Sequence, residues 1–358
     1  MSHMDRIRPF HTIAILLGAF FLMSCDSEKL HPKPQAMGEP SRITVVTDQS
    51  IWKGAVGDTL RALFERPYLI TPQVEPLFDL RYFMPISVQG DVYKRSLRTY
   101  IIPVNTSDTT TQTARLISRL IDKNILSRAI RDTSITNRIY KNVWAGGQVI
   151  VVIFGKNQQQ LAQRIKGQYA SIVNLVKQHD SKLIDKRAFV EGEHPKLMRL
   201  IDSLFGLKMR IPKGYYIAVK KKNILWIRKE YMEINMNIMI SRYRYKDATQ
   251  VSKEGMIKMF NEQGKLVTTD TPGDRVIIDD QHFPVILYTK RMDGYYVVEM
   301  RGIWNTLKDF FGGPMVGLAI IDPKKGTVYF LSGFVYAPSK KKRDLIQQLY
   351  HILSTVKL

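Results

Sequence analysis

The stretch Met315-Val-Gly-Leu-Ala-Ile-Ile321, Asp322-Pro-Lys-Lys-Gly326, Thr327-Val-Tyr-Phe-Leu-Ser-Gly-Phe-Val-Tyr-Ala337 decides the fold of the second half of this chain. Two apolar runs rich in β-branched and aromatic residues flank a short segment with a proline and a glycine. This pattern is typical of a β-hairpin, because the runs favour strands and the central segment favours a turn. We therefore predict two long antiparallel strands here.

The segments around this hairpin repeat its pattern. Pro284–Lys290 and Tyr295–Ile303 flank Met292-Asp-Gly294, and Asp-Gly is a strong hairpin turn. Further strands are predicted at 216–219, 224–228 and 235–245, and a helix at 252–260. A last helix carries an apolar stripe at three-to-four spacing, formed by Leu345, Ile346, Leu349, Ile352, Leu353 and Val356. A largely antiparallel sheet covered by helices belongs to the α+β class.

The first half of the chain mixes strands and helices. Strands are predicted at 43–47, 97–104 and 148–154, and the last is a continuous apolar run that suits a strand buried on both faces. Helices are predicted at 114–130 and 157–205, the second with a break near 191–195. The proline-rich segment 67–85 is predicted to be an edge strand or a loop. We expect two α+β domains, an N-terminal one at 42–207 and a C-terminal one at 208–358.

The beginning of the chain has the pattern of a secretory signal, which we place at 1–24. Arg6 and Arg8 precede an apolar run at 13–23 that is too short to span a bilayer. Leu22-Met-Ser-Cys25 is similar to a bacterial lipobox, in which the cysteine is acylated, for example with palmitate. We therefore expect Cys25, the only cysteine, to anchor the chain in the cell envelope, at the outer membrane on either its periplasmic or its surface face.

Residues 25–41 are predicted to be the lipidated N-terminus and a tether, because they are polar, contain prolines and show no periodicity. Fifteen extended residues reach at most about 50 Å. If Cys25 is acylated, no thiol remains for a disulfide, a metal or a nucleophile. The folded part then has to rely on its hydrophobic core.

The chain is strongly basic, with 54 Lys and Arg against 32 Asp and Glu, a formal net charge of +22. Such a charge usually points to nucleic acid as a partner, but an exported protein meets little of it. The expected partners are the membrane, through the acyl anchor, and anionic lipid, lipopolysaccharide or glycan. Envelope proteins are further possible partners. The alternative is that the charge only keeps the protein soluble.

Several phrases that mix Trp, Pro and Gly carry a family resemblance. They are Pro72-Gln-Val-Glu-Pro-Leu-Phe78, Val143-Trp-Ala-Gly-Gly-Gln148, Ile211-Pro-Lys-Gly-Tyr215, Leu225-Trp-Ile-Arg228, Arg301-Gly-Ile-Trp304, Gly312-Gly-Pro314 and Gly333-Phe-Val-Tyr-Ala-Pro338. Their order resembles an uncharacterised Bacteroidota lipoprotein family, the domain of unknown function numbered 4837, over nearly the whole chain after Ser41. The resemblance implies an envelope lipoprotein and no known activity, so no catalytic residue is carried over. More weakly, the C-terminal half resembles the PsbP/Mog1-like fold.

The sequence contains no recognisable catalytic or cofactor motif. It lacks a Gly-x-Ser-x-Gly elbow, a Walker loop and a Gly-x-Gly-x-x-Gly fingerprint. The histidines of the mature chain are not spaced as a helical metal pair, so we expect no metal and no cofactor. Gly146-Gly147 and Gly312-Gly313 are read as turns with positive φ. Glu75 and Asp79 lie four residues apart, but the flanking prolines argue against one helix, so the sequence does not favour an acid/base pair and Glu75 could as easily hydrogen-bond its own loop.

Two basic clusters are the candidate anion-binding residues. Lys340, Lys341, Lys342 and Arg343 open the last helix, where cations oppose the helix dipole unless an anion binds there. In the strand at 241–246, alternation places Arg242 and Arg244 on one face and Tyr243 and Tyr245 on the other. The alternative for both clusters is an ordinary solvated surface.

The sequence thus predicts a lipid-anchored envelope protein that acts as a non-catalytic binding or assembly module for anionic envelope components. The alternative is a hydrolase acting on envelope glycan or lipid with carboxylates drawn from distant segments.

Overall fold

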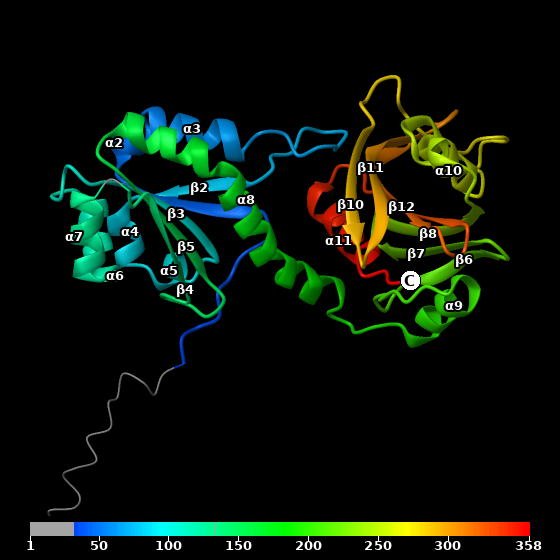
Figure 1. Ribbon diagram of the computed structural model, residues 1–358, viewed down its shortest axis with the longest axis horizontal. Helices are drawn as coiled ribbons and strands as arrows, with labels where there is room; N and C mark the ends of the chain where they lie inside the picture. The colour runs from blue at the N-terminus through cyan, green and yellow to red at the C-terminus, as the bar shows by residue number, and fades with distance from the viewer. Residues whose placement is uncertain (1–31, 133) are drawn as a thin grey trace, which may run out of the picture.

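The computed structural model describes residues 32–132 and 134–358 (Figure 1), so the signal and Cys25 lie outside the described residues. The chain forms two domains joined by one long helix. Each domain contains both helices and strands, which confirms the α+β class. No helix among the described residues is both long enough and apolar enough to cross a membrane.

The N-terminal domain is built on a five-stranded sheet in the order β2-β1-β3-β5-β4. Four strands are parallel, and the edge strand β4 runs antiparallel to β5. Their bounds are β1 Arg42–Val46, β2 Asp79–Phe83, β3 Thr99–Asn105, β4 Asn137–Lys141 and β5 Val149–Gly155. The predicted strands are confirmed, and the apolar run at 148–154 forms the buried β5. The mainly parallel pairing was not predicted, because it depends on crossovers rather than on local turns.

Helices cover both faces of this sheet. The helices α2 and α3 and the first part of α8 pack on one face, and α4 to α7 on the other. The bounds are α2 Gln49–Trp52, α3 Ala55–Phe64, α4 Pro85–Gln89, α5 Val92–Arg95, α6 Gln112–Leu120, α7 Lys123–Arg131 and α8 Gln158–Ala188. The single helix predicted at 114–130 is wrong, because Asp122 accepts a hydrogen bond from Asn124 N and starts a new helix there.

The C-terminal domain is an eight-stranded antiparallel sheet with the strand order β10-β11-β12-β13-β8-β7-β6, in which β9 also pairs with β11. The strands are β6 Tyr216–Lys221, β7 Ile224–Tyr231, β8 Ile234–Arg244, β9 Val276–Ile278, β10 Ile286–Met292, β11 Tyr295–Thr306, β12 Gly312–Asp322 and β13 Thr327–Tyr336. The predicted hairpin is confirmed, because β12 and β13 pair from Met315–Phe334 to Asp322–Thr327. The antiparallel prediction therefore holds for this domain.

Helices lie on both faces of the second sheet. The helices α9 Pro195–Phe205 and α11 Arg343–Leu353 cover one face, and α10 Lys253–Gly264 with the short 3₁₀ helix η3 Ala248–Val251 lies on the other. We predicted the domain boundary at 207/208. However, α9 packs Leu197, Ile201 and Phe205 into the C-terminal core, so the packing places the boundary just after α8.

The first described residues are attached to the N-terminal domain rather than free. Gln35 forms a β-bridge with Gly146, and Met37 forms one with Leu97. Ala36 N and Met37 N each donate a 2.7 Å hydrogen bond to this domain. The segment predicted as a tether up to residue 41 therefore ends near residue 33.

An arm at residues 67–78 reaches from the N-terminal domain to the C-terminal one (Figure 1). Near its base, Pro67 and Pro76 form an antiparallel bridge, and Tyr68 packs against the cores of both domains. Glu75 is buried, and its carboxylate accepts hydrogen bonds from Lys342 N at 2.6 Å and Arg343 N at 3.1 Å. The arm thus caps α11 with a carboxylate from the other domain.

We predict that Glu75→Ala loosens this junction. The substitution leaves two amides at the start of α11 without acceptors, which costs about 2 kcal/mol of unfolding free energy. Hydrogen exchange should become faster at the start of α11, and the urea midpoint should fall. Gln73→Ala is the control, since Gln73 reaches only Lys342 Nζ, at 3.3 Å. Unchanged exchange in α11 would show that the cap does not hold the helix.

Candidate anion-binding site

Three arginines from neighbouring parallel strands share one face of the N-terminal sheet. In the register, Arg42 aligns with Asp79, and Thr44 aligns with both Arg81 and Tyr100. Aligned residues of neighbouring strands lie on the same face of a sheet, and so do residues two apart in one strand. Arg42 stands two residues before Thr44, and Arg98, just before β3, stands two residues before Tyr100. Both therefore share the face of Arg81.

These arginines line a cavity of about 430 Å³ at the amino-terminal ends of the strands. Further parts of its wall are formed by Tyr93 and by Met37 to Glu39, which belong to the segment before β1 (residues 32–41, the leading segment). Lys341 extends into it from the C-terminal domain. We call this the arginine cavity. Both domains therefore contribute to its lining.

The arginine cavity contains more positive than negative charge. Its two carboxylates are held by arginines that do not line it: Glu39 by Arg187, and Asp79 Oδ2 by Arg343 Nη2 at 2.9 Å. The hydrogen bond from Arg187 lowers the pKa of Glu39, so Glu39 stays ionised.

The lining cations have only weak partners in return. Arg42 Nε lies 4.0 Å from Asp79 Oδ2, and Lys341 Nζ lies 3.8 Å from Asp79 Oδ1. Arg81 is exposed and has no hydrogen-bond or ion-pair partner among the described residues. The cavity therefore keeps a positive charge that its own residues do not neutralise.

Arg98 lies at the inner side of this cavity with incomplete hydrogen bonding. Its Nη2 lies 3.3 Å from His179 Nε2, while its Nε is buried without a partner in the described structure. Burial, and then the charge of Arg98, lowers the pKa of His179 to about 4. The neutral ring accepts through Nε2, so its proton is on Nδ1. Thr99 also lines the cavity, but its Oγ1 is buried and has no partner among the described residues.

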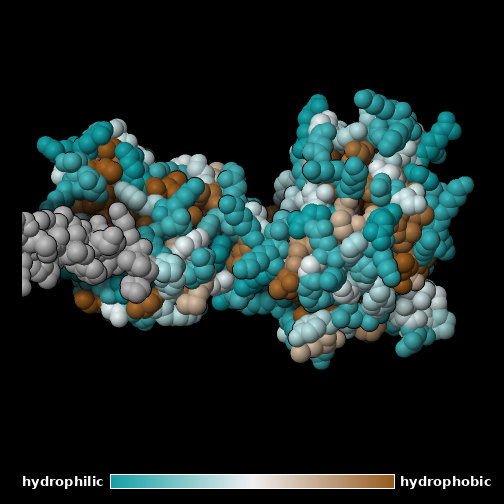
Figure 2. Space-filling view, turned by 90° about the horizontal axis from the view of Figure 1, so that it is seen from below, coloured by the Kyte–Doolittle hydropathy of each residue, from teal (hydrophilic) through white to brown (hydrophobic). Residues whose placement is uncertain are grey.

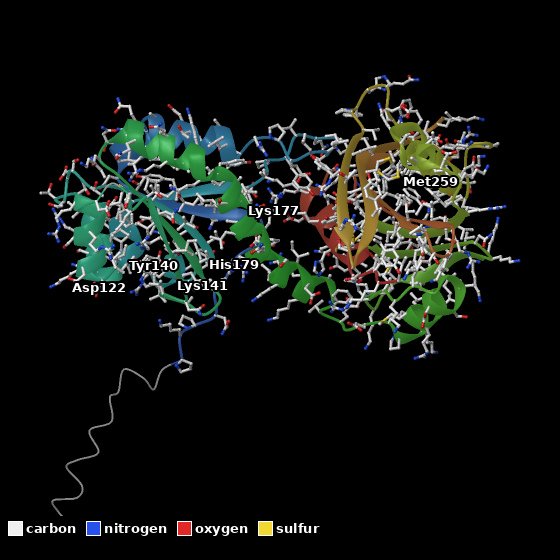
Figure 3. The ribbon with its side chains drawn as sticks, in the orientation of Figure 1. Asp122, Tyr140, Lys141, Lys177, His179 and Met259 are labelled. Atoms are coloured by element: carbon white, nitrogen blue, oxygen red, sulfur yellow. The ribbon has the colours of Figure 1, made fainter. Side chains whose placement is uncertain are left out.

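Figure 3 places His179 and Lys177 on the part of α8 that runs between the two domains. A second cavity, of about 290 Å³, lies beside it, between α8, the arm and α11. Lys177 and Arg301 line it, and Asp180 is the only carboxylate among its described lining residues. Burial and the charges of Arg301 and Arg66 lower the pKa of Lys177.

The predicted cluster at the start of α11 is divided by the structure. Lys340 is exposed and Lys341 lines the arginine cavity. Lys342 and Arg343 are buried: their amides bind Glu75, and Arg343 also donates to Pro76 O at 2.7 Å. The predicted anion site at the helix amides is therefore wrong for an external ligand, because the chain's own carboxylate fills it.

The predicted pair on β8 lies apart from the arginine cavity. Tyr243 and Tyr245 pack on the core side with α10, as alternation predicted, and Arg242 and Arg244 line a separate open hollow with Lys325. Arg242 Nη2 donates to Asn223 Oδ1 at 3.0 Å. The structure does not bring these two arginines to Lys341.

Sequence reasoning missed Arg42, Arg81 and Arg98. Each stands next to apolar strand residues, and no motif marks any of them. Only the pairing of β1 with β2 and β3 brings them together. No group of three or more His, Cys, Asp or Glu in the described ranges could hold a metal ion.

The face of the molecule seen from below is mainly polar (Figure 2). Seen from below, hydrophilic side chains cover most of both domains, and apolar ones form small separate areas (Figure 2). This distribution agrees with the high net charge of the sequence.

Two family models match the chain. Residues 194–355 match the Domain of unknown function (DUF4837), and residues 36–189 match the Domain of unknown function (DUF8532). The predicted match to the domain of unknown function numbered 4837 is therefore confirmed for the C-terminal domain, whereas the N-terminal domain, which we expected it to include, matches a different model. The search of curated proteins finds no match.

Several solved structures are similar to part of the chain. The Ran-binding protein Mog1p of Saccharomyces cerevisiae is 10% identical, with 43% of this chain and 92% of Mog1p covered and a TM-score of 0.29. A STAR-related lipid transfer protein of Xanthomonas axonopodis is 14% identical, with 40% and 96% covered and a TM-score of 0.22. Human StAR-related lipid transfer protein 5 is 10% identical, with 49% and 91% covered and a TM-score of 0.23. Mog1p fits the expected resemblance, but likeness at this level carries no argument about function.

We predict a pH dependence that comes from Asp180. Burial raises its pKa to about 6, although Ser41 N donates to its carboxylate at 2.7 Å. A raised pKa in the folded state means that stability is lost as the pH rises from about 4 through about 6. Asp180→Asn should remove this loss and add about 2 kcal/mol to the unfolding free energy at pH 7.

Urea unfolding between pH 4 and pH 8 measures this effect. At pH 4 the variant and the parent should have nearly the same stability, since Asp180 is then largely protonated when folded. Asp202→Asn, on α9, is the control for a change of charge alone. A stability difference that stays constant over the whole pH range would contradict the assignment.

Proposed function

We propose that this chain, whose two halves match domain families of unknown function, is a lipid-anchored envelope protein that binds an anionic envelope component in the arginine cavity. The observation that carries the proposal is the charge of that cavity. Arg42, Arg81, Arg98 and Lys341 surround it, while both of its carboxylates are held by Arg187 and Arg343. We further propose that the protein is a Bacteroidota lipoprotein, as its N-terminal sequence suggests.

The chemistry of the lining favours an oxyanion. Guanidinium groups bind phosphate or carboxylate through paired N–H donors, and several guanidinium groups around one cavity suit a phosphate best. A volume of about 430 Å³ admits a whole headgroup and not only an ion. The ligand class is therefore a phosphate-bearing headgroup, of a phospholipid or of lipopolysaccharide.

The position of the leading segment supports a ligand at the membrane. Pro34 O accepts from Gly146 N at 2.8 Å, and Met37 to Glu39 then line the cavity. Cys25 precedes Pro34 by nine residues, which extend over at most about 30 Å. An acylated Cys25 would therefore keep the cavity close to lipid headgroups.

The two cavities between the described domains offer no pair of carboxylates that would favour the hydrolase. An acid/base pair needs two carboxylates facing one another with different pKa values. In the arginine cavity both carboxylates are engaged by arginines, and Asp180 is the only carboxylate among the described residues that line the second cavity.

Charge-matched double variants test the binding site. In an unacylated Cys25→Ser background, Arg42→Gln with Arg81→Gln should weaken binding to phosphatidylglycerol vesicles and to lipopolysaccharide about tenfold, because charge-assisted hydrogen bonds are lost. Arg242→Gln with Arg244→Gln removes the same charge from β8 and should change binding little. Co-sedimentation and calorimetry give the affinities.

The comparison of the two pairs decides the matter. Equal loss of binding in both would show that attraction depends on net charge alone and not on the arginine cavity. Unchanged binding in the first pair would remove the cavity as the site.

The anchor is tested separately. Cys25→Ser should abolish incorporation of labelled palmitate and release the protein from the membrane fraction, because acyl chains provide the stable attachment. Ser27→Ala, two residues further on, should stay acylated. A Cys25→Ser protein that remains with membranes after a high-salt wash would contradict the anchor.

A further inference from the structure

A second candidate site lies on the C-terminal domain, on the sheet face that packs α10. Trp226, Trp304, Phe311, Phe334 and Tyr336 line a shallow hollow of about 160 Å³. We call it the aromatic hollow. It shares no residue with the arginine cavity.

Strand register explains how the hollow forms. Across β11, β12, β13 and β8, Trp304 pairs with Gly313, and Tyr336 pairs with Asn235. A side chain at Gly313 would meet Val335 O at 2.0 Å and Trp304 Nε1 at 3.0 Å. The glycine therefore lets the indole lie close to the sheet and donate to Val335 O at 3.1 Å. Its role is close packing and not the positive φ that we predicted.

The aromatic rings are held firmly in place. Trp226 Nε1 donates to Asn237 Oδ1 at 3.0 Å, and Phe334 packs edge-on against Trp304 with ring centroids 5.4 Å apart. Phe311 makes an edge contact with Tyr336 at 5.3 Å, and 41% of its surface is exposed. Trp226, Trp304 and Phe334 are buried, so Phe311 and Tyr336 provide most of the ring surface that the fold leaves exposed in the hollow.

Polar groups with unused bonding capacity lie among these rings. Asn237 is buried and uses its oxygen for Trp226, while its side-chain nitrogen has no partner among the described residues. Asn235 lines the hollow, and its side-chain amide makes no hydrogen bond in the described structure. Arg228 Nε is buried and unpaired. Its guanidinium is paired with Glu230, so the hollow is close to neutral.

These features select the chemistry of a ligand. An acyl chain would cover the rings but leave the side-chain amides of Asn235 and Asn237 without a hydrogen-bond partner, at a cost of about 1–3 kcal/mol for each group. A free phosphate would leave the rings bare. A sugar ring offers apolar C–H faces for the aromatic side chains and hydroxyl oxygens for the N–H donors.

We infer that the aromatic hollow is a binding site for a neutral saccharide unit of a glycan. The rings of Phe311 and Tyr336 stack on the sugar, and the side-chain amides of Asn235 and Asn237 donate to its hydroxyl groups. This site is separate from the arginine cavity, so neither assignment depends on the other.

Titration with neutral tetrasaccharides tests the site. Two of the four tryptophans line the hollow, so binding of maltotetraose, cellotetraose or chitotetraose should change the tryptophan fluorescence. Phe311→Ala and Asn235→Ala should each weaken binding about threefold to tenfold. Phe311 is partly exposed and Asn235 has no internal partner, so both variants should fold; circular dichroism checks this.

Phe310→Ala is the matched control. Phe310 is fully exposed on the same turn but does not line the hollow, so its loss should leave the affinity unchanged. The inference is overturned if none of the three sugars binds at up to about 10 mM. It is also overturned if Phe310→Ala weakens binding as much as Phe311→Ala, or if decanol binds in the hollow and the sugars do not.

Discussion

The structure depends most on one buried carboxylate. Glu75 leaves the N-terminal domain on the arm and accepts both amides at the start of α11, while Asp79, at the base of the arm, pairs with the buried Arg343. Burying an arginine is costly unless its charge and its donors are matched. Arg343 is matched by Asp79, Asp344 and Pro76 O, so it stabilises the junction only when the two domains are docked.

The same junction explains why one basic cluster has two roles. A run of four cations at a helix N-terminus opposes the dipole unless anions are near. The chain supplies these anions for Lys342 and Arg343, and turns Lys341 toward the arginine cavity. Lys342 and Arg343, which hold the domains together, therefore have carboxylate partners, whereas Lys341 has only a weak one, 3.8 Å away. The formal charge of +22 alone could not separate these two cases.

Local signals predicted much of the fold and little of the site. The Asp-Gly turn at 293–294, the strands at 315–337 and the stripe on α11 act through neighbours in sequence, and each was confirmed. The arginine cavity arises from pairing between β1, β2 and β3 and from docking of Lys341, which join residues up to about 300 positions apart. For Glu75 the sequence suggested a hydrogen bond within its own loop, because nothing near it in sequence shows that α11 would cover it.

Docking of the domains and binding of an anion are linked by this geometry. Lys341 lines the same cavity as Arg42 and Arg81, and the next residue, Lys342, is held by Glu75 of the other domain. An anion that contacts both sets of cations therefore binds the docked arrangement and not the separated one, and it stabilises docking by mass action. The repulsion among these cations acts in the opposite direction, since in the empty cavity it favours separation. Under the proposed function, a bound phosphate would remove that repulsion, bond to both domains and complete an interface that the chain alone leaves positively charged.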